Sequence, residues 1–189
     1  KGHDFSRVTL VGVLLADLTL FSGDYRAGER TFDLLTQAAG RAGRGDVPGK
    51  VVIQTYKPDN YAITAAASQD YRAFYDIEEA YRSLMRYPPE WNMMVIMGTG
   101  MDEEQLANIM DRMYSLIRGK YINAGHLSVI GPSEPAISKI KDVYRRVLYI
   151  KHRDYRMLVD VKDYVEEWLK ENGENDVSVF FDLNPVNMY

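Results

Sequence analysis

The first half of the chain alternates apolar runs with one amphipathic stretch. A nearly continuous apolar run at Val8–Leu15 predicts a strand that is buried on both faces. Ala27–Ala39 carries apolar residues at helical spacing, and a second strand-like run follows at Val47–Thr55. A strand, a helix and a strand in this order predict a parallel α/β unit with helices on the faces of the sheet.

A longer amphipathic stretch over residues 59–86 predicts one helix. Its apolar stripe consists of Tyr71, Phe74, Tyr75, Ile77, Tyr81 and Leu84. Pro88-Pro89 ends the helix, because proline lacks the amide hydrogen and disfavours a helical conformation in the residue before it. We interpret residues 68–89 as the connection between a first domain, residues 1–67, and a second domain, residues 90–189.

The second half alternates short apolar runs with two amphipathic helices. The predicted elements are strands at Met93–Met97, Leu127–Ile130, Val143–Lys151 and Val177–Leu183, and helices at Asp102–Arg118 and Tyr155–Glu171. The resulting order, βαββαβ, is that of a ferredoxin-like α+β sandwich.

Composition excludes several classes of site. The 189 residues contain no cysteine, which excludes a disulfide scaffold, a thiolate zinc site and a cysteine nucleophile within them. The three histidines lie far apart in the sequence, so we predict no metal site here. No apolar run reaches the roughly 20 residues that span a bilayer, and no signal-peptide pattern opens the chain, so we expect no membrane contact and a cytoplasmic location.

The net charge of −4 is unevenly distributed. Residues 1–67 hold eight Lys or Arg against seven Asp or Glu, whereas residues 68–189 hold fifteen against twenty. Neither half is uniformly basic, so any contact with nucleic acid must be local.

One such local feature is a group of basic residues along the predicted strand Val143–Lys151 and on either side of it. They are Lys139, Lys141, Arg145, Arg146, Lys151, Arg153 and Arg156. Alternation along the strand puts Arg145, Val147, Tyr149 and Lys151 on one face. Basic and aromatic side chains on one face can contact phosphates and stack on bases; the alternative is a solvated face of an acidic domain.

The motif with the most chemical content lies between the first predicted helix and the second predicted strand. Arg41 and Arg44 are three residues apart, and each follows a glycine, Gly40 or Gly43, with Gln37 upstream. Glycine permits close approach to a ligand, and arginine offers a fixed fork of donors to phosphate oxygens. The alternative is a helix C-terminus with favourable cations and a glycine cap. The glutamine at its fixed distance and the upstream strand favour the phosphate site.

This block resembles motif VI of superfamily-two helicases, and the surrounding residues narrow the resemblance to one family. They are Lys1-Gly2-His3-Asp4-Phe5, Val8-Thr9-Leu10-Val11-Gly12-Val13, Ala16-Asp17, Asp24-Tyr25-Arg26-Ala27-Gly28-Glu29-Arg30-Thr31-Phe32, Ile53-Gln54-Thr55-Tyr56, Gly131-Pro132-Ser133, Tyr144-Arg145 and Asp182-Leu183-Asn184-Pro185. They resemble the PriA (primosomal protein N′) family of replication-restart DNA helicases. The match is dense over residues 1–89 and sparser beyond them.

The resemblance implies that residues 1–67 are the end of a second RecA-like motor lobe and that the chain is a C-terminal fragment. Arg41 and Arg44 would reach the γ-phosphate of ATP, and Gln37, Gly40 and Gly43 would organise this loop. The motif V residues Gly2 and Asp4 would bind near the nucleotide or couple it to DNA; a surface carboxylate is the alternative for Asp4. Arg26, Glu29 and Arg30 would form ion pairs that fix the helix before motif VI; a DNA contact is the alternative.

The resemblance also implies what lies elsewhere. ATP and Mg²⁺ would be bound mostly by a first lobe, and Zn²⁺ by a cysteine-rich insertion upstream of these residues. No Gly-x-x-x-x-Gly-Lys-Ser/Thr phosphate loop occurs in the sequence. We therefore expect no ATPase or unwinding activity from the chain alone.

For the second domain, the resemblance implies binding of branched or single-stranded DNA, docking of the acidic tail of the single-stranded DNA-binding protein, and contact with other primosome proteins. The candidate contacts are Lys141, Arg145, Arg146, Lys151 and Arg156, with Arg156 proposed to meet the acidic tail. Val147 stands where the family usually has glutamine, so the contact set differs in detail.

Together these features imply the C-terminal part of an ATP-dependent 3′→5′ DNA helicase that restarts stalled replication forks and loads the primosome. One alternative is a non-catalytic module that binds DNA or a partner in isolation. Another is a different superfamily-two translocase, which the Asp24–Arg30 block disfavours.

Overall fold

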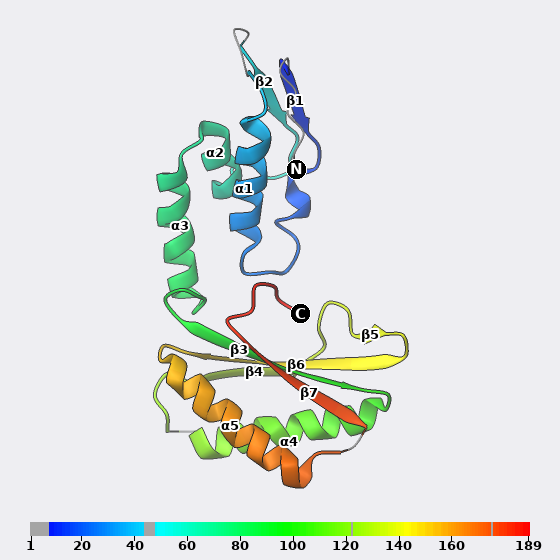
Figure 1. The fold of residues 1–189 in the computed structure, drawn as a ribbon. Helices are drawn as coiled ribbons and strands as arrows, with labels where there is room; N and C mark the ends of the chain where they lie inside the picture. Colours follow the sequence, from blue (N-terminus) through cyan, green and yellow to red (C-terminus); the bar gives the residue numbers. More distant parts are fainter. Residues whose placement is uncertain (1–7, 44–47, 122, 175) are drawn as a thin grey trace. The chain divides into compact units, whose positions relative to one another are not determined.

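The computed structural model describes residues 8–43, 48–121, 123–174 and 176–189 (Figure 1). The chain divides into two compact units, with the boundary between Tyr81 and Arg82. Each unit is described by itself below.

The first unit begins with a parallel pair of strands. Strand β1 (Leu10–Val13) pairs in parallel with β2 (Lys50–Ile53), and the 3-10 helix η1 (Ala16–Leu18) and the helix α1 (Ala27–Ala39) lie between them in sequence. The predicted strand, helix and strand are therefore confirmed, and α1 has the predicted bounds. The prediction that the first strand is buried on both faces is wrong: Leu10 is 61% exposed, because the described residues of this unit form a sheet of only two strands.

Two further helices complete the core of this unit. Apolar side chains of α1 pack against α2 (Tyr61–Ser68) and the start of α3 (Tyr71–Leu84). The rings of Phe32 and Phe74 stack with centroids 4.3 Å apart. Offset aromatic stacking adds specific geometry to the burial of these large side chains.

The single helix predicted over residues 59–86 is wrong, because the chain breaks it into α2 and α3. Gln69 takes a left-handed conformation with φ of 55°, which ends α2. Asp70 then starts α3, since its Oδ1 accepts a hydrogen bond of 2.9 Å from the backbone N–H of Ala73. A side-chain acceptor at this position satisfies an amide that the first helical turn leaves without a partner.

The second unit is an antiparallel sheet with two helices on one face (Figure 1). Its elements are β3 (Asn92–Gly100), α4 (Glu103–Tyr121), β4 (Ser128–Ser133), β5 (Lys139–Ile140), β6 (Val143–His152), α5 (Tyr155–Asn172) and β7 (Val177–Leu183). The strand order is β4-β6-β3-β7, and β5 also pairs with β6. The element order is the predicted βαββαβ with the short β5 added.

Strand β4 lies at one edge of this sheet. Its pairing with β6 shifts register between Ile130 and Ser133, where Gly131 and Pro132 stand. Gly131 has φ of 101°, and a Cβ at this position would lie 2.7 Å from the carbonyl oxygen of Val147. The bulge in β4 therefore depends on glycine, which alone takes this backbone conformation without strain.

The core of the second unit lies between the sheet and the two helices. Alternate residues of the central strands, such as Met94 in β3 and Leu148 in β6, pack against Met113 of α4 and Val161 of α5. Three methionines of β3, Met93, Met94 and Met97, are buried. Met101, which follows the end of β3, is exposed.

Asp154 caps the N-terminus of α5, and we expect its loss to weaken this helix. Its Oδ1 accepts a hydrogen bond of 2.9 Å from the backbone N–H of Arg156. Asp154→Ala is expected to lower the free energy of unfolding by about 1 kcal/mol, measured by urea denaturation followed by circular dichroism. Asp160→Ala, at an exposed position within the same helix, is the control; equal effects of the two substitutions would contradict the role of the cap.

Candidate functional site

The Gly-Arg motif begins in the turn that ends α1. The backbone N–H of Gly40 donates to the carbonyl oxygen of Thr36 at 3.0 Å, and that of Arg41 donates to Ala38 at 3.1 Å. The shorter spacing at Arg41 tightens the last turn, as is common where an α-helix ends. The backbone of Arg41 is therefore fixed at the C-terminus of α1, and the residue is half-buried.

Gly43 connects this turn to the sheet. Its backbone N–H donates to the carbonyl oxygen of Val8 at 2.9 Å, and its φ is 72°. A Cβ on Gly43 would lie 2.7 Å from the backbone nitrogen of Gly49. Both the left-handed conformation and the close approach of Gly49 require glycine here. The loop after α1 is thus held against the chain segments next to β1 and β2.

The structure brings Gln37, Gly40, Arg41 and Gly43 together at the end of α1, with Gln37 exposed on its last turn. The remaining predicted residues of this site, Gly2, Asp4 and Arg44, lie outside the described residues. Their proposed roles stay predictions.

The ion pairs predicted before motif VI are confirmed. Arg26 binds the Glu29 carboxylate through two nitrogens, with Nη2 at 2.6 Å from Oε1 and Nε at 3.1 Å from Oε2. Arg30 pairs with Asp24 at 3.0 Å. Bidentate pairing of this kind is geometrically specific, so the block fixes the start of α1, the helix that precedes Arg41.

The buried carboxylate of Asp17 joins the segments that follow the two parallel strands. The sequence motifs gave this carboxylate no role. Asp17, just after β1, accepts hydrogen bonds from Oγ1 of Thr55 at 2.7 Å and from the backbone N–H of Tyr56 at 2.9 Å, both just after β2. These hydrogen bonds hold the pKa of the Asp17 carboxyl below its ordinary value. Its position next to β1 was a signal, since ligands bind at the carboxyl ends of parallel strands. Here both carboxylate oxygens serve the fold.

In the second unit, the predicted alternation along β6 is confirmed. Leu148 and Ile150 face the helices, while Val147 packs with Val95 and Met97 in a separate cluster that Tyr149 also contacts. Arg145 shares the face of Val147.

The two neighbouring arginines of β6 are both engaged within the domain. Arg145 donates from Nη1 to the carbonyl oxygen of Ile137 at 3.0 Å, and Arg146 lies 3.8 Å from Glu103 at the start of α4. Lys141, before β6, and Arg156, in the first turn of α5, are exposed. The structure therefore does not bring all five predicted contacts onto one surface.

The expected surface position of Lys151 is wrong. Lys151 is 5% exposed; its Nζ donates to the carbonyl oxygen of Met85 at 3.1 Å and lies 3.5 Å from the ring centroid of Tyr87. Burial, and secondarily the positive charge of Arg86, lower the pKa of Lys151 to about 8. The alternation of β6 could not reveal this, because the covering segment precedes β3, more than sixty residues away in the sequence.

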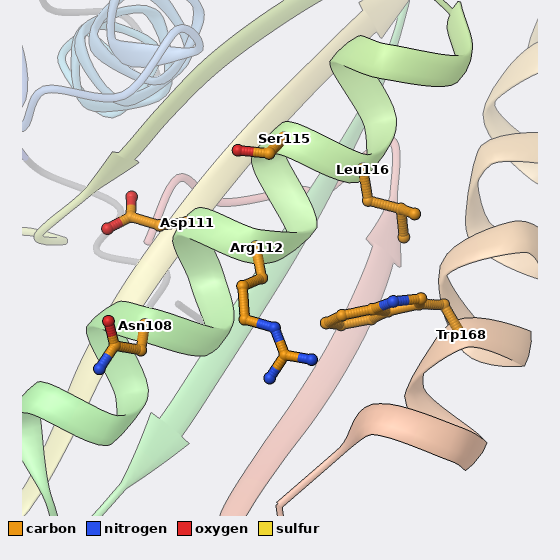
Figure 2. Close-up of a pocket in the computed structure, with 6 residues that line it drawn as sticks. All are labelled: Asn108, Asp111, Arg112, Ser115, Leu116 and Trp168. Carbon is orange, nitrogen blue, oxygen red and sulfur yellow. The ribbon is translucent and has the colours of Figure 1, made fainter.

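A pocket of about 430 Å³ lies on the helical layer, lined by Asn108, Asp111, Arg112, Ser115, Leu116 and Trp168 (Figure 2). The guanidinium carbon of Arg112 lies 4.9 Å from the ring centroid of Trp168, and its Nη2 donates to Oδ1 of Asn172 at 3.3 Å. The Arg112 side chain thus joins α4 to α5 at one side of the pocket.

Among the described residues, no group of three or more histidine, aspartate or glutamate side chains gathers in a way that could hold a metal ion. Among the same residues, no helix has the length and apolar character needed to cross a membrane.

Comparison with known proteins gives a consistent family. The family model described as the primosomal protein N C-terminal domain matches residues 83–186. "Replication restart protein PriA" of Bacillus subtilis is 38% identical over 190 residues, which cover all of this chain and 23% of that protein. The proteins of the same name from Haemophilus influenzae and Synechocystis sp. are 32% and 31% identical, and each match covers all of this chain. The chain spans about a quarter of the length of these relatives.

Proposed function

Since this chain belongs to the family of primosomal protein N C-terminal domains, we propose that it is the C-terminal part of an ATP-dependent 3′→5′ DNA helicase that restarts stalled replication forks. The observation that carries the proposal is the extent of the similarity: replication restart proteins match the whole chain, and not only the part that the family model covers. Both units therefore belong to the proposed activity.

The first unit would contribute to ATP hydrolysis as the end of a RecA-like lobe. The parallel pairing of β1 and β2 around α1 supports this assignment. Arg41 and Arg44 would neutralise charge on the γ-phosphate, and Gln37 would orient them. Gly2 and Asp4 would couple the nucleotide to DNA. The fixed turn at Gly40 and the glycine-dependent approach at Gly43 suit a loop that must hold Arg41 in one place.

The second unit would bind branched or single-stranded DNA, the acidic tail of the single-stranded DNA-binding protein and other primosome proteins. We assign it to the ferredoxin-like class, which its strand order β4-β6-β3-β7 and the placement of α4 and α5 on one face support. The exposed cations Lys141 and Arg156 are its candidate contacts for phosphates or for an acidic tail.

We assign the metal sites of the proposed enzyme to segments of the longer protein that lie outside this chain. The described residues hold no cluster of metal ligands, and the sequence has no cysteine for a zinc site. Mg²⁺ would neutralise the phosphates of ATP, and the arginines of this chain would meet the γ-phosphate.

A chimera tests the proposal directly. This chain replaces the matching segment of the Bacillus subtilis replication restart protein, and unwinding of a labelled fork DNA is measured with and without ATP. We expect ATP-dependent unwinding by the chimera and none by the same protein truncated before the segment. A chimera that folds, as judged by a cooperative thermal transition, and hydrolyses no ATP on fork DNA contradicts the proposal.

A further inference from the structure

Trp91, just before β3, is the centre of a cluster of cations in the second unit. The ring is 5% exposed, and the guanidinium carbons of Arg86 and Arg153 lie 5.0 Å and 5.4 Å from its centroid. The ring of His126 meets it edge-on at 6.3 Å. These residues come from the segment after α3, the end of β6 and the turn before β4, so the fold brings together three distant parts of the sequence.

Lys151 adds a third cationic side chain next to this pair. It lies two residues before Arg153, and the positive charge of Arg86 contributes to lowering its pKa. The two groups are therefore close enough to repel each other. Holding like charges together disfavours their charged forms unless an anion lies nearby.

These three cations have no carboxylate partner within the described residues. None of Arg86, Lys151 and Arg153 lies at salt-bridge distance from a carboxylate there. Elsewhere in this acidic unit cations are paired, for example Lys162 with Glu166 at 2.8 Å. The cluster is thus an exception in a chain whose net charge is −4.

The contacts with Trp91 leave the two arginines able to bind a ligand. A cation–π contact uses no N–H donor for a hydrogen bond, so the N–H edges of a guanidinium beside an aromatic ring stay available to acceptors. Both arginines are exposed residues, so these edges can reach a ligand from solvent. The two guanidinium carbons are no more than about 10 Å apart, since both distances are measured from one ring centroid.

We propose that Arg86 and Arg153, with Lys151 behind them, form a phosphate-binding site that takes the backbone of a nucleic-acid strand. A strand carries one phosphate for each roughly 3.4 Å of helix axis, so two arginines no more than about 10 Å apart lie within the span of a few consecutive phosphates. Because Trp91 is buried, its own ring does not stack on a base, and the arginines meet the phosphate backbone, which carries no sequence information. The site rests on the proposed function, in which this unit binds DNA.

The test uses the whole 189-residue chain and a fluorescein-labelled oligothymidine, with affinity measured by anisotropy over a range of salt concentrations. Each phosphate contact to a single strand contributes about 0.7 to the slope of log Kobs against log salt. Arg86→Gln/Arg153→Gln is expected to reduce that slope by about 1.4, and the affinity roughly 25-fold at about 0.1 M salt. The charge-matched control, Arg118→Gln/Lys170→Gln on the exposed surfaces of α4 and α5, is expected to change the affinity less than about twofold.

A second variant separates charge from folding. Arg86→Lys/Arg153→Lys keeps both charges and is expected to recover most of the salt slope. If the wild-type chain binds the oligonucleotide and the glutamine variant keeps its slope, the site is overturned and the proposed function stands. If the wild type binds no DNA, the proposed function of this unit fails. If the glutamine variant instead loses binding of a poly-glutamate peptide while DNA binding is unchanged, the ligand is an acidic peptide and the assignment to nucleic acid is wrong.

Discussion

Replacing Arg41 by alanine in the chimera is expected to lower kcat for DNA-stimulated ATP hydrolysis by roughly 10³-fold. Arginines that neutralise charge on a transferred phosphoryl group contribute about 10³ to 10⁵ in rate. The hydrogen bonds of Gly40 and Arg41 with the end of α1 place the backbone of this arginine in a defined turn. Because the charge develops in the transition state, kcat and kcat/KM for ATP should fall together.

Two further variants make this result specific. Arg41→Lys keeps the charge and loses the fork of donors, and it is expected to recover little of the rate. Arg72→Ala removes an exposed arginine that pairs with Asp76 within α3, and its kcat should stay within about twofold of the wild type. Unchanged kcat in the Arg41→Ala chimera would remove this residue from the proposed site.

The buried Lys151 is expected to make stability rise with pH in alkaline solution. Its pKa falls from an ordinary value of 10.5 to about 8 in the folded chain, first because of burial. Between these values the unfolded chain holds the proton and the folded chain does not, so raising the pH favours the folded state. Below about pH 8 both states are protonated, and the cost of burying the charge is constant. From pH 8 to pH 10.5, the free energy of unfolding of the wild type should rise by about 3 kcal/mol relative to that of Lys151→Met.

Urea denaturation of both proteins at several pH values measures this difference. Tyrosines also titrate in this range, and the comparison with Lys151→Met removes their contribution because both proteins contain them. Lys141→Met, at an exposed position, is the control and should keep a constant difference from the wild type. A constant difference for Lys151→Met as well would show that the ammonium group is not buried in the folded chain.

Features that depend only on residues close together in the sequence were predicted correctly. The helix α1 has the predicted bounds because its apolar spacing and the glycine that follows it both lie within the segment. The alternation of Val147 and Leu148 along β6 follows from the two-residue period of a strand. The ion pair of Arg26 with Glu29 spans three residues of one helix, so its spacing alone indicates the contact.

The errors concern features that depend on distant residues or on a single dihedral angle. Glutamine is not a residue type that indicates a left-handed conformation. The sequence around Gln69 therefore did not reveal that α2 and α3 are separate helices. The burial of Lys151 depends on Met85 and Tyr87, which reach it only through tertiary structure. The cluster around Trp91 was missed for the same reason, since its cations come from separate segments.

The bulge of β4 protects one edge of the sheet in the second unit from pairing with another molecule. An outer strand with a regular row of unpaired amides and carbonyls recruits the strand of another molecule. In β4 the register shift at Ile130 interrupts that row, and Pro132 has no amide hydrogen to offer. A neighbouring molecule therefore finds no continuous strand to pair with on this side. Pro132 and the irregular pairing of β4 thus keep this edge of the sheet from extending into a neighbouring molecule.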